Sequence, residues 1–410
     1  MHMTQAQEDR EWGFLKTLQG DVFLQKIWTQ GIDTVFIVGD MAEGNNAGGM
    51  VARSIDQGES WEKQLLPVST LKDIVFIDHN IGYAVGDKGS IVKTSDGGVT
   101  WIPLNCGTDV DLNAIAAIGS DSIWVVGGRY YTSTYYTGIV LHSTDGGETW
   151  SQPHFFLEED SKEFTDVAFR DNKGYITCYG AVYKTTDHGE NWEKQIVVEN
   201  DFYRGINITE NKAYMLIEND LYFTEDMVNW KAQDVYIYPF SDALFFLNDN
   251  LGYHSYGRQI DGSDGDPIVI TTADGGRNWT RMKIDYNTMS HPPVSSDSDI
   301  RMVNDTLGYA IFYESILKMP KPSNSNSTKK IFMNNNLSVV SPSDKLIIQS
   351  PSSIIQSVDL LDISGKILES EKFNNNDLEA EINTGHIPHG MYIIRTSLEG
   401  NKIMFNKWIK

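Results

Sequence analysis

The stretch Thr94-Ser95-Asp96-Gly97-Gly98-Val99-Thr100-Trp101 decides the fold of this chain, because five more copies of it occur along the sequence. One copy, Thr224 to Trp230, is a residue short and has lost its glycine. Neighbouring copies are 39 to 49 residues apart, which predicts a solenoid, a propeller or an array. The six aspartates of the copies are Asp56, Asp96, Asp145, Asp187, Asp226 and Asp274.

The chemistry of this repeat is that of a turn. An Asp side chain accepts hydrogen bonds from backbone N–H groups two or three residues on, and Gly adopts positive φ without steric cost. The hydroxyl residues add bonds between side chain and backbone, and the Trp anchors the next strand in the core. We therefore assign a structural role, without catalysis, to Asp56, Trp61, Asp96, Trp101, Asp145, Trp150, Asp187, Trp192, Asp274 and Trp279.

Each repeat contains four short segments of strand-forming residues separated by turns, which predicts one antiparallel blade. Six such units cover residues 22–284, and a seventh begins near Ile300 but stops after three strands. Residues 12–16 resemble the strand that follows a repeat, so we expect the N-terminal strand to complete the last blade. The prediction is an all-β chain with a seven-bladed β-propeller over residues 12–319, closed by its N-terminal strand.

Two family resemblances support this architecture. The repeat resembles the Asp-box of bacterial sialidase-like propellers, in which the box lies between the third and fourth strands, away from the ligand face. Residues 82–94, Gly-Tyr-Ala-Val-Gly-Asp-Lys-Gly-Ser-Ile-Val-Lys-Thr, resemble the photosystem II stability and assembly factors and their non-photosynthetic bacterial relatives. This resemblance covers the whole ring and implies a fold, whereas propellers host many functions. The photosynthetic members are associated with a basic surface, from which this acidic chain departs.

The C-terminal part of the chain has a different character. Residues 320–336 form a polar, Pro-bearing linker, and the short alternating strands of residues 337–410 predict a small Ig-like β-sandwich. Residues 361–368, 387–395 and 407–410 resemble the C-terminal type A sorting domain of the type IX secretion system of Bacteroidota. The resemblance implies export to the cell surface, often with removal of this domain, and the signal residues are Gly365, Gly390, Tyr392, Lys407 and Lys410.

Charge and composition limit the partners of the chain. Residues 1–319 hold 23 Lys and Arg against 47 Asp and Glu, a net charge of −24. This charge repels nucleic acids and anionic membranes, so cations, basic proteins and neutral glycans are the easier partners; simple solubility is the alternative reason. No apolar run is long enough to span a bilayer. Residues 1–11 resemble leader residues on a chain whose signal peptide has been removed. The two cysteines, Cys106 and Cys178, suggest neither a disulfide scaffold nor a zinc site.

Three long connections between second and third strands, at residues 39–49, 127–138 and 256–267, are expected to carry the ligand face. The second connection contains four tyrosines. Tyrosine rings stack on sugar rings or contact protein partners, and packing of the loop onto its neighbours is the alternative role. An acidic segment in the third connection offers oxygen ligands for calcium, the one suggested cofactor, although its spacing does not match an EF-hand and a solvated turn is the alternative. The ligand-binding candidates are Arg129, Tyr130, Tyr131, Tyr135, Tyr136 and Arg258, and the metal candidates are Asp261, Asp264 and Asp266.

These observations favour a secreted cell-surface propeller that binds a glycan or a protein without catalysis, like an adhesin in gliding or surface attachment. The alternative is a glycoside hydrolase on a sialidase-like fold; it would not be a true sialidase, because the Arg-Ile-Pro motif is missing. Hydrolysis needs two carboxylates across the bond, and the sequence does not single out a pair. In a third hypothesis, the chain is a passenger whose best-defined partner is the type IX secretion machinery. No Ser-His-Asp signature, P-loop or HExxH motif occurs.

Overall fold

A computed structural model describes the chain at residues 11–18, 21–43, 46–132, 135–153, 163–199, 201–236, 243–257, 267–285, 298–312, 315–320, 329–333, 337–341, 345–349, 354–362, 366–373, 379–384, 391–399 and 402–409. The chain divides into two compact units, residues 1–322 and 323–410. Strands dominate both units; the single helical turn in the described ranges is the 3₁₀ turn η1, Asp87–Gly89. The predicted all-β class is therefore confirmed.

The described strands of the first unit form seven sheets, which we number as blades in chain order. Blade 1 contains β2 (Asp21–Gln30), β3 (Thr34–Glu43), β4 (Asn46–Ser54) and β5 (Glu62–Leu66), and blade 2 contains β6 (Leu71–Phe76), β7 (Gly82–Gly86), β8 (Ser90–Thr94) and β9 (Ile102–Leu104). Blade 3 contains β10 (Leu112–Ile118), β11 (Ser122–Thr132) and β12 (Tyr135–Ser143), and blade 4 contains β13 (Phe164–Arg170), β14 (Lys173–Cys178), β15 (Ala181–Thr185) and β16 (Glu193–Gln195).

The remaining blades follow the same order. Blade 5 contains β17 (Tyr203–Ile208), β18 (Ala213–Ile217), β19 (Asp220–Thr224) and β20 (Lys231–Tyr236), and blade 6 contains β21 (Leu244–Phe246), β22 (Gly252–Gly257), β23 (Pro267–Thr272) and β24 (Thr280–Arg281). Blade 7 contains β26 (Ser298–Met302), β27 (Gly308–Phe312) and β28 (Ser315–Met319), together with β1 (Glu11–Thr17) and β25 (Lys283–Asp285).

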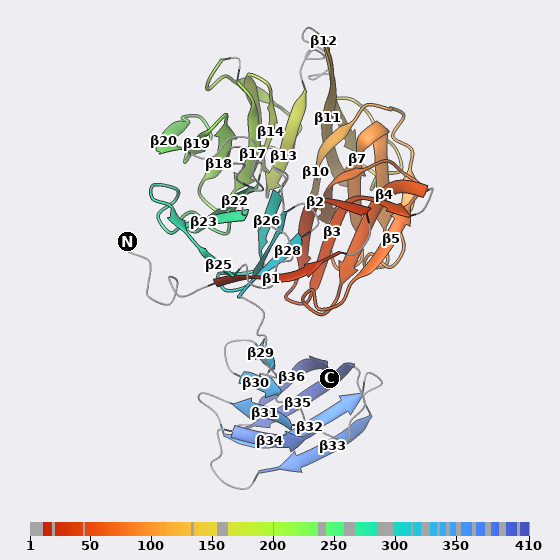
Figure 1. Cartoon of the computed structure of the whole chain (residues 1–410), viewed down its shortest axis with the longest axis vertical. Helices are drawn as coiled ribbons and strands as arrows, with labels where there is room; N and C mark the ends of the chain where they lie inside the picture. Colours follow the sequence, from red (N-terminus) through yellow and green to blue (C-terminus); the bar gives the residue numbers. More distant parts are fainter. Residues whose placement is uncertain are drawn as a thin grey trace. The chain divides into compact units, whose positions relative to one another are not determined.

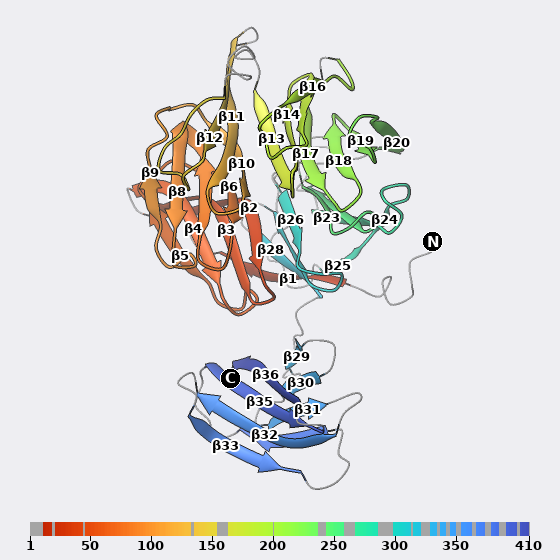
Figure 2. The ribbon, with the colours of Figure 1, turned by 180° about the vertical axis from the view of Figure 1, so that it is seen from behind.

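The first strands of the blades form a closed ring. Each of them contacts the first strand of the next blade, and β26 of blade 7 contacts β2 of blade 1. In Figure 1 the colours run once around the unit, and cyan β26 and β28 lie beside red β1 and β2; Figure 2 shows the same neighbours from behind. Buried clusters fill the space between successive blades, for example Trp124, Val126, Val167 and Ile176 between blades 3 and 4. This cyclic contact of first strands is the architecture of a propeller.

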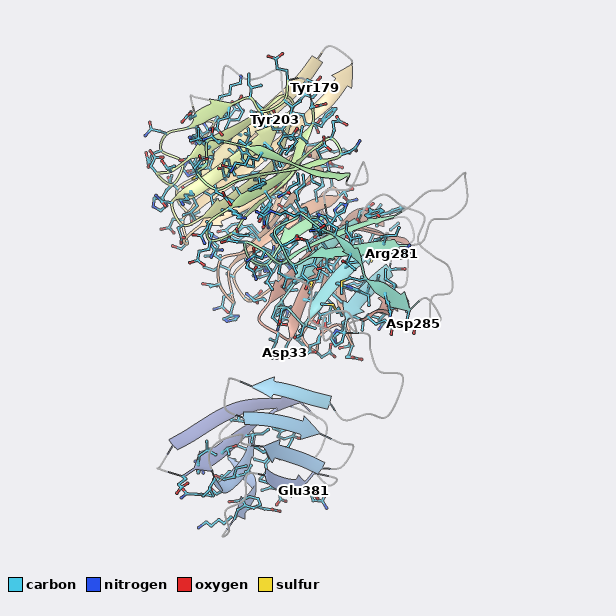
Figure 3. All side chains as sticks on the ribbon, turned by 90° about the vertical axis from the view of Figure 1, so that its left-hand side faces the viewer. Asp33, Tyr179, Tyr203, Arg281, Asp285 and Glu381 are labelled. Carbon is cyan, nitrogen blue, oxygen red and sulfur yellow. The ribbon has the colours of Figure 1, made fainter. Side chains whose placement is uncertain are left out.

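The N-terminal strand closes the ring, as the sequence predicts. β1 pairs antiparallel with β28, so that Gly13 lies opposite Lys318. On its other side β1 pairs parallel with β25, which follows directly after β24 of blade 6. The chain therefore crosses from blade 6 to blade 7 between Arg281 and Asp285, both labelled in Figure 3. Trp12 of β1 is fully buried, and its indole N–H lies 3.2 Å from the sulfur of Met282.

The second unit consists of two four-stranded sheets that share one core. One sheet orders β29 (Lys329–Met333), β30 (Leu337–Ser341), β31 (Lys345–Gln349) and β34 (Glu379–Asn383), and the other orders β33 (Ile367–Lys372), β32 (Ile355–Asp362), β35 (Met391–Leu398) and β36 (Lys402–Ile409). Leu346 and Ile382 of the first sheet belong to the same buried cluster as Leu360 and Ile394 of the second. β29 falls inside the expected linker, because Lys329–Met333 pairs with Leu337–Ser341.

Candidate functional site

The Asp-boxes form a tight hydrogen-bond network. Asp96 Oδ1 accepts the backbone N–H of Thr100 at 2.9 Å, and Asp96 Oδ2 accepts the Thr100 hydroxyl at 2.6 Å. The Thr94 hydroxyl donates to Asp96 Oδ1 and accepts the N–H of Gly98. The carboxylate of Asp96 thus binds a residue four positions on, and Gly97 and Gly98 at positive φ turn the chain back towards it. In the shortened box, Asp226 accepts the N–H groups of Val228 and Asn229, two and three positions on, as expected. The bonds from Thr100 are the main cause that lowers the pKa of Asp96 to about 2.

A buried tyrosine hydroxyl near the shortened box of blade 5 has no hydrogen-bond partner among the described residues. In blade 2 the Tyr83 hydroxyl donates to the carbonyl of Gly146, in the box of the next blade, at 2.7 Å. Tyr175 has the same position in blade 4, and in the described part of the chain its buried hydroxyl has no hydrogen-bond partner. A cavity of about 20 Å³ lies there, lined in part by Tyr175, Lys212 and Met227. This is room for about one water molecule, so we assign no ligand to it.

Two of the three long connections are not loops, and this part of the sequence prediction was wrong. β3 and β4 stay paired up to Glu43 and Asn46, and β11 and β12 up to Thr132 and Tyr135. These four strands have 9 to 11 residues, against 5 or 6 for the second and third strands of the other blades. In the β11–β12 hairpin, strand-forming Tyr and Thr residues continue the ladder, whereas the extension of β3–β4 is made mainly of Gly, Ala and Met. Figure 1 shows β11 and β12 reaching past the other strands.

The backbone pairing places several predicted ligand contacts. Tyr130 lies opposite Tyr136 and Arg129 opposite Thr137, and Tyr131 falls where the register shifts. The side chains of residues 129–137 lie outside the described set, so their role stays a prediction. In the second unit Tyr392 is buried, and Lys407 pairs with Ile393 in the strand ladder. Five further groups of candidate residues lie outside the described residues: Arg258; Asp261, Asp264 and Asp266; Gly365; Gly390; and Lys410.

A polar network joins residues of blades 2 and 3 to Glu163, which precedes the first strand of blade 4. The Lys72 ammonium is 2.6 Å from Asp87 Oδ1 and donates to Asn113 Oδ1 at 3.3 Å. The Asn113 amide donates to Glu163 Oε1 at 3.4 Å and to the backbone of Phe164. Burial raises the pKa of Glu163, and burial, reinforced by the charge of Asp87, raises that of Asp40 in β3. We call this network, together with the β3–β4 and β11–β12 hairpins, the hairpin face.

A second set of charged residues lies on the first strands, around the axis of the ring. Asp73, Asp166 and Asp299 occupy one repeat position in blades 2, 4 and 7, and Lys26 occupies it in blade 1. The Lys26 ammonium lies 3.4 Å from Asp299 Oδ1. Each aspartate accepts a backbone N–H from the first strand of the next blade, at 2.9 to 3.0 Å; the three donors are Ile115, Ile206 and Ile27. These carboxylates therefore join neighbouring blades.

Burial dominates the acidity of two members of this axial set, Asp73 and Asp166. It raises the pKa of Asp166 to about 7 and also raises that of Asp73, while the charge of Lys26 opposes both shifts. Both oxygens of Asp166 are occupied, because Oδ1 accepts the N–H of Val167 and Oδ2 that of Ile206. Asp73 is bound in the same way. A carboxylate with both oxygens bound to backbone donors is poorly placed to exchange protons with a substrate.

Sequence reasoning missed this axial set, although a signal was present. The first strands Leu71-Lys72-Asp73-Ile74 and Phe164-Thr165-Asp166-Val167 share an Asp before a β-branched residue. This shared Asp marks the axial position in an alignment of the first strands of the blades. In the described residues no group of three His, Cys, Asp or Glu side chains is arranged to hold a metal ion. Cys106 and Cys178 are both buried and form no disulfide.

The comparison with protein families fits both units. Residues 53–235 match the model of the Photosynthesis system II assembly factor YCF48, and residues 342–410 match that of the Secretion system C-terminal sorting domain. The chain is a propeller similar to the photosystem II assembly factors, followed by a secretion sorting domain. This assembly-factor-like propeller is 28% identical over 207 residues to the Photosystem II assembly lipoprotein Ycf48 of Synechococcus sp. (strain CC9902), covering 48% of this chain and 60% of that protein. The chain spans about three fifths of the length of the first curated relatives that it matches.

Solved structures support the same fold. The structure titled YCF48 bound to D1 peptide superposes with a TM-score of 0.52 at 15% identity, covering 77% of this chain and 95% of that one. The GH74 xyloglucanase from Xanthomonas campestris superposes with a TM-score of 0.55 at 10% identity, covering 97% of this chain and 74% of that one. At these identities the likeness shows a propeller fold and nothing of the chemistry.

The sorting domain settles the destination of the assembly-factor-like propeller. A C-terminal domain of this family directs secretion through the type IX system to the cell surface, so the chain is a secreted surface protein. A search of the described residues finds no helix with the length and hydropathy needed to cross a membrane.

Proposed function

We propose that this secreted propeller is a non-catalytic binding module of the cell surface, which holds a glycan or a protein at the hairpin face. The length of the two hairpins carries the proposal, because their strands are nearly twice as long as the equivalent strands of other blades. The other blades take their places in the ring with second and third strands of 5 or 6 residues, so the extra length is not needed for the fold. Additions to a regular repeat are where binding functions are usually found.

The charge of the propeller narrows the choice of partner. With a net charge of −24 over residues 1–319, neutral glycans and basic protein surfaces are favoured over anionic polymers. The relatives are named as assembly factors, and one related structure is titled as bound to a peptide, which supports a protein as one of the two partners. A role in gliding or surface attachment belongs to this proposal.

The test is an array experiment on the full chain. Wild-type protein is applied to glycan and peptide arrays, and the release of reducing sugar is recorded in parallel. A variant in which residues 129–137 are replaced by a short turn like Asp87-Lys88-Gly89 of blade 2 should lose binding. Asp187→Asn, at the opposite end of a blade, is the matched control and should bind like wild type. Unchanged binding by this variant, and by a second one in which residues 41–48 of the β3–β4 hairpin are replaced in the same way, would rule out the hairpin face.

A glycoside hydrolase is the second candidate, motivated by the aspartates on the axis. Hydrolysis of a glycosidic bond needs two carboxylates on either side of it. Asp73 and Asp166 each accept two backbone N–H bonds, so neither carboxylate is free to act as the acid or base of hydrolysis. This arrangement supports a binding function over hydrolysis. Release of reducing sugar by wild type, lost in Asp73→Asn or Asp166→Asn, would reverse this preference.

A further inference from the structure

An aromatic pair reaches the surface where blades 4 and 5 meet. Tyr179 lies in the connection between β14 and β15, Phe202 directly precedes β17, and their backbones form an isolated antiparallel bridge. The two ring centres are 5.0 Å apart, and the ring planes meet at 70°. Phe202 is 37% exposed, and Tyr179, labelled in Figure 3, is partly exposed. The pair lies at the end of the ring that carries the long hairpins, because those hairpins also join second to third strands.

Backbone hydrogen bonds bring three short connections together at this pair. The Gly180 N–H donates to the carbonyl of Asp201 at 2.8 Å, and the Glu218 N–H donates to the carbonyl of Phe202 at 3.1 Å. The connections are the β14–β15 turn, the segment that leads from blade 4 into blade 5, and the β18–β19 turn. They form one surface, which we call the aromatic–acidic patch and define by Tyr179, Asp201, Phe202, Glu218 and Asp220.

The patch is crowded with negative charge. Glu218 and Asp220 are exposed, and Asp201 is partly exposed. Burial raises the pKa of Asp201, and the charge of Glu218, a hydrogen bond to its carboxyl group and the charge of Asp220 raise it further. Among the described residues, no Lys or Arg forms an ion pair with any of these three. Carboxylates this close repel one another, so a cation that joins them is stabilised.

The patch continues into the hairpin face. The Tyr179 N–H lies 3.4 Å from the carbonyl of Glu163, which accepts it. The side chain of Glu163 accepts the Asn113 amide in the polar network of that face. A partner on the hairpin face therefore reaches the aromatic pair without leaving this end of the ring.

We propose that the aromatic–acidic patch binds an arginine side chain in a basic segment of a protein partner. This inference rests on the proposed binding function and selects a protein over a glycan as the partner. A guanidinium is attracted to aromatic faces and binds carboxylates through paired N–H donors. A neutral glycan leaves the carboxylate charges uncompensated, and rings that meet at 70° form a corner, not a flat platform for a sugar ring.

A purely structural role of the aromatic pair, in which the two rings only seal the junction of blades 4 and 5, makes a different prediction. Phe202→Leu keeps an apolar side chain at this position but removes the aromatic ring, and Phe202→Tyr keeps the ring. If the pair only seals the junction, both variants bind a partner equally well. If the ring contacts a cation, Phe202→Leu loses affinity even though it is folded, which thermal unfolding followed by circular dichroism verifies.

The experiment is titration calorimetry on the full chain at physiological ionic strength, where the field of distant charges decays within about 8 Å. A tetra-arginine peptide is the probe, and a tetra-citrulline peptide, similar in shape but uncharged, is the control ligand. Wild type should bind the arginine peptide roughly tenfold more tightly or better. Phe202→Leu should weaken this binding by roughly fivefold, the size of one cation–π contact, and Phe202→Tyr should leave it unchanged.

A matched pair of double variants tests the carboxylates. Asp201→Asn with Glu218→Gln should weaken the arginine peptide by roughly fivefold or more, since two charge-assisted contacts are lost. Glu59→Gln with Glu190→Gln makes the same change in net charge at exposed positions in the Asp-boxes, at the other end of the blades, and should leave binding unchanged. An equal loss in both double variants would mean that the overall charge alone attracts the peptide, which would overturn the inference.

Two further results would overturn it: equal binding of the arginine and citrulline peptides by wild type, and full binding of the arginine peptide by folded Phe202→Leu. The variants with shortened hairpins keep the patch and should still bind the arginine peptide, so the hairpin-face proposal can fail while this inference stands. Conversely, a wild-type chain that binds glycans through the hairpins but ignores the arginine peptide would keep the proposed binding function and refute the aromatic–acidic patch.

Discussion

Tyr83 and Tyr175 occupy the same position in different blades, but only Tyr83 finds an acceptor for its hydroxyl among the described residues. A hydrogen bond of this kind contributes about 1 kcal/mol to stability. Tyr83→Phe should therefore lower the free energy of unfolding by about 1 kcal/mol, and Tyr175→Phe should change it by less than about 0.5 kcal/mol. Urea unfolding of the two variants checks this. Equal losses would show that the shortened box still serves Tyr175.

Asp166 should make stability depend on pH. Its folded pKa of about 7 lies above the value near 4 in the unfolded chain, so the native state holds the proton more tightly. Stability from this group is present at low pH and falls as pH rises towards 7, by about 2 to 3 kcal/mol between pH 5 and pH 8. Asp166→Asn should flatten this slope in urea unfolding. Asp187→Asn removes a carboxyl whose pKa is lowered to about 2, and it should leave the slope unchanged.

At the scale of elements, closure of the propeller ring depends on β1 and above all on its Trp12. Trp12 is fully buried against blades 6 and 7, in a cluster with Met282, Leu317 and Met319. Trp12→Ala should lower the free energy of unfolding by about 3 to 5 kcal/mol, through lost burial and the cavity left behind. Thermal unfolding measures the loss. Ile102→Ala, at a side chain that is 62% exposed, is the control and should change stability by less than about 0.5 kcal/mol.

The sequence predicted those elements whose signal is local. The boxes and the strand character of residues 12–16 revealed the repeat and the closing strand, because Asp, Gly and Trp at fixed spacing specify a turn. The long hairpins and the parallel pairing of β25 with β1 were not predicted, since strand pairing depends on partners far along the chain.

At the scale of the whole molecule, the first compact unit should fold without the second, and the second should be needed only for secretion. Deleting residues 323–410 removes the second unit as the structure bounds it. The truncated propeller should keep its thermal midpoint but remain inside the cell, because the signal for secretion lies in the deleted part. Cell fractionation and protease treatment of intact cells provide the measurement. Surface display of the truncated chain would contradict a sorting role for this domain.

β1 is separated by a long stretch of sequence from both strands that it pairs with. β1 is synthesised before the other described strands of the propeller, but its partners β25 and β28 end at Asp285 and Met319. The N-terminal strand must therefore wait unpaired while some 270 further residues are made, and contacts of such long sequence separation form slowly. We therefore expect ring closure to be a late step of propeller assembly. The sorting domain follows directly in the chain, so a ribosome that stops early yields a product lacking both the closed ring and the export signal.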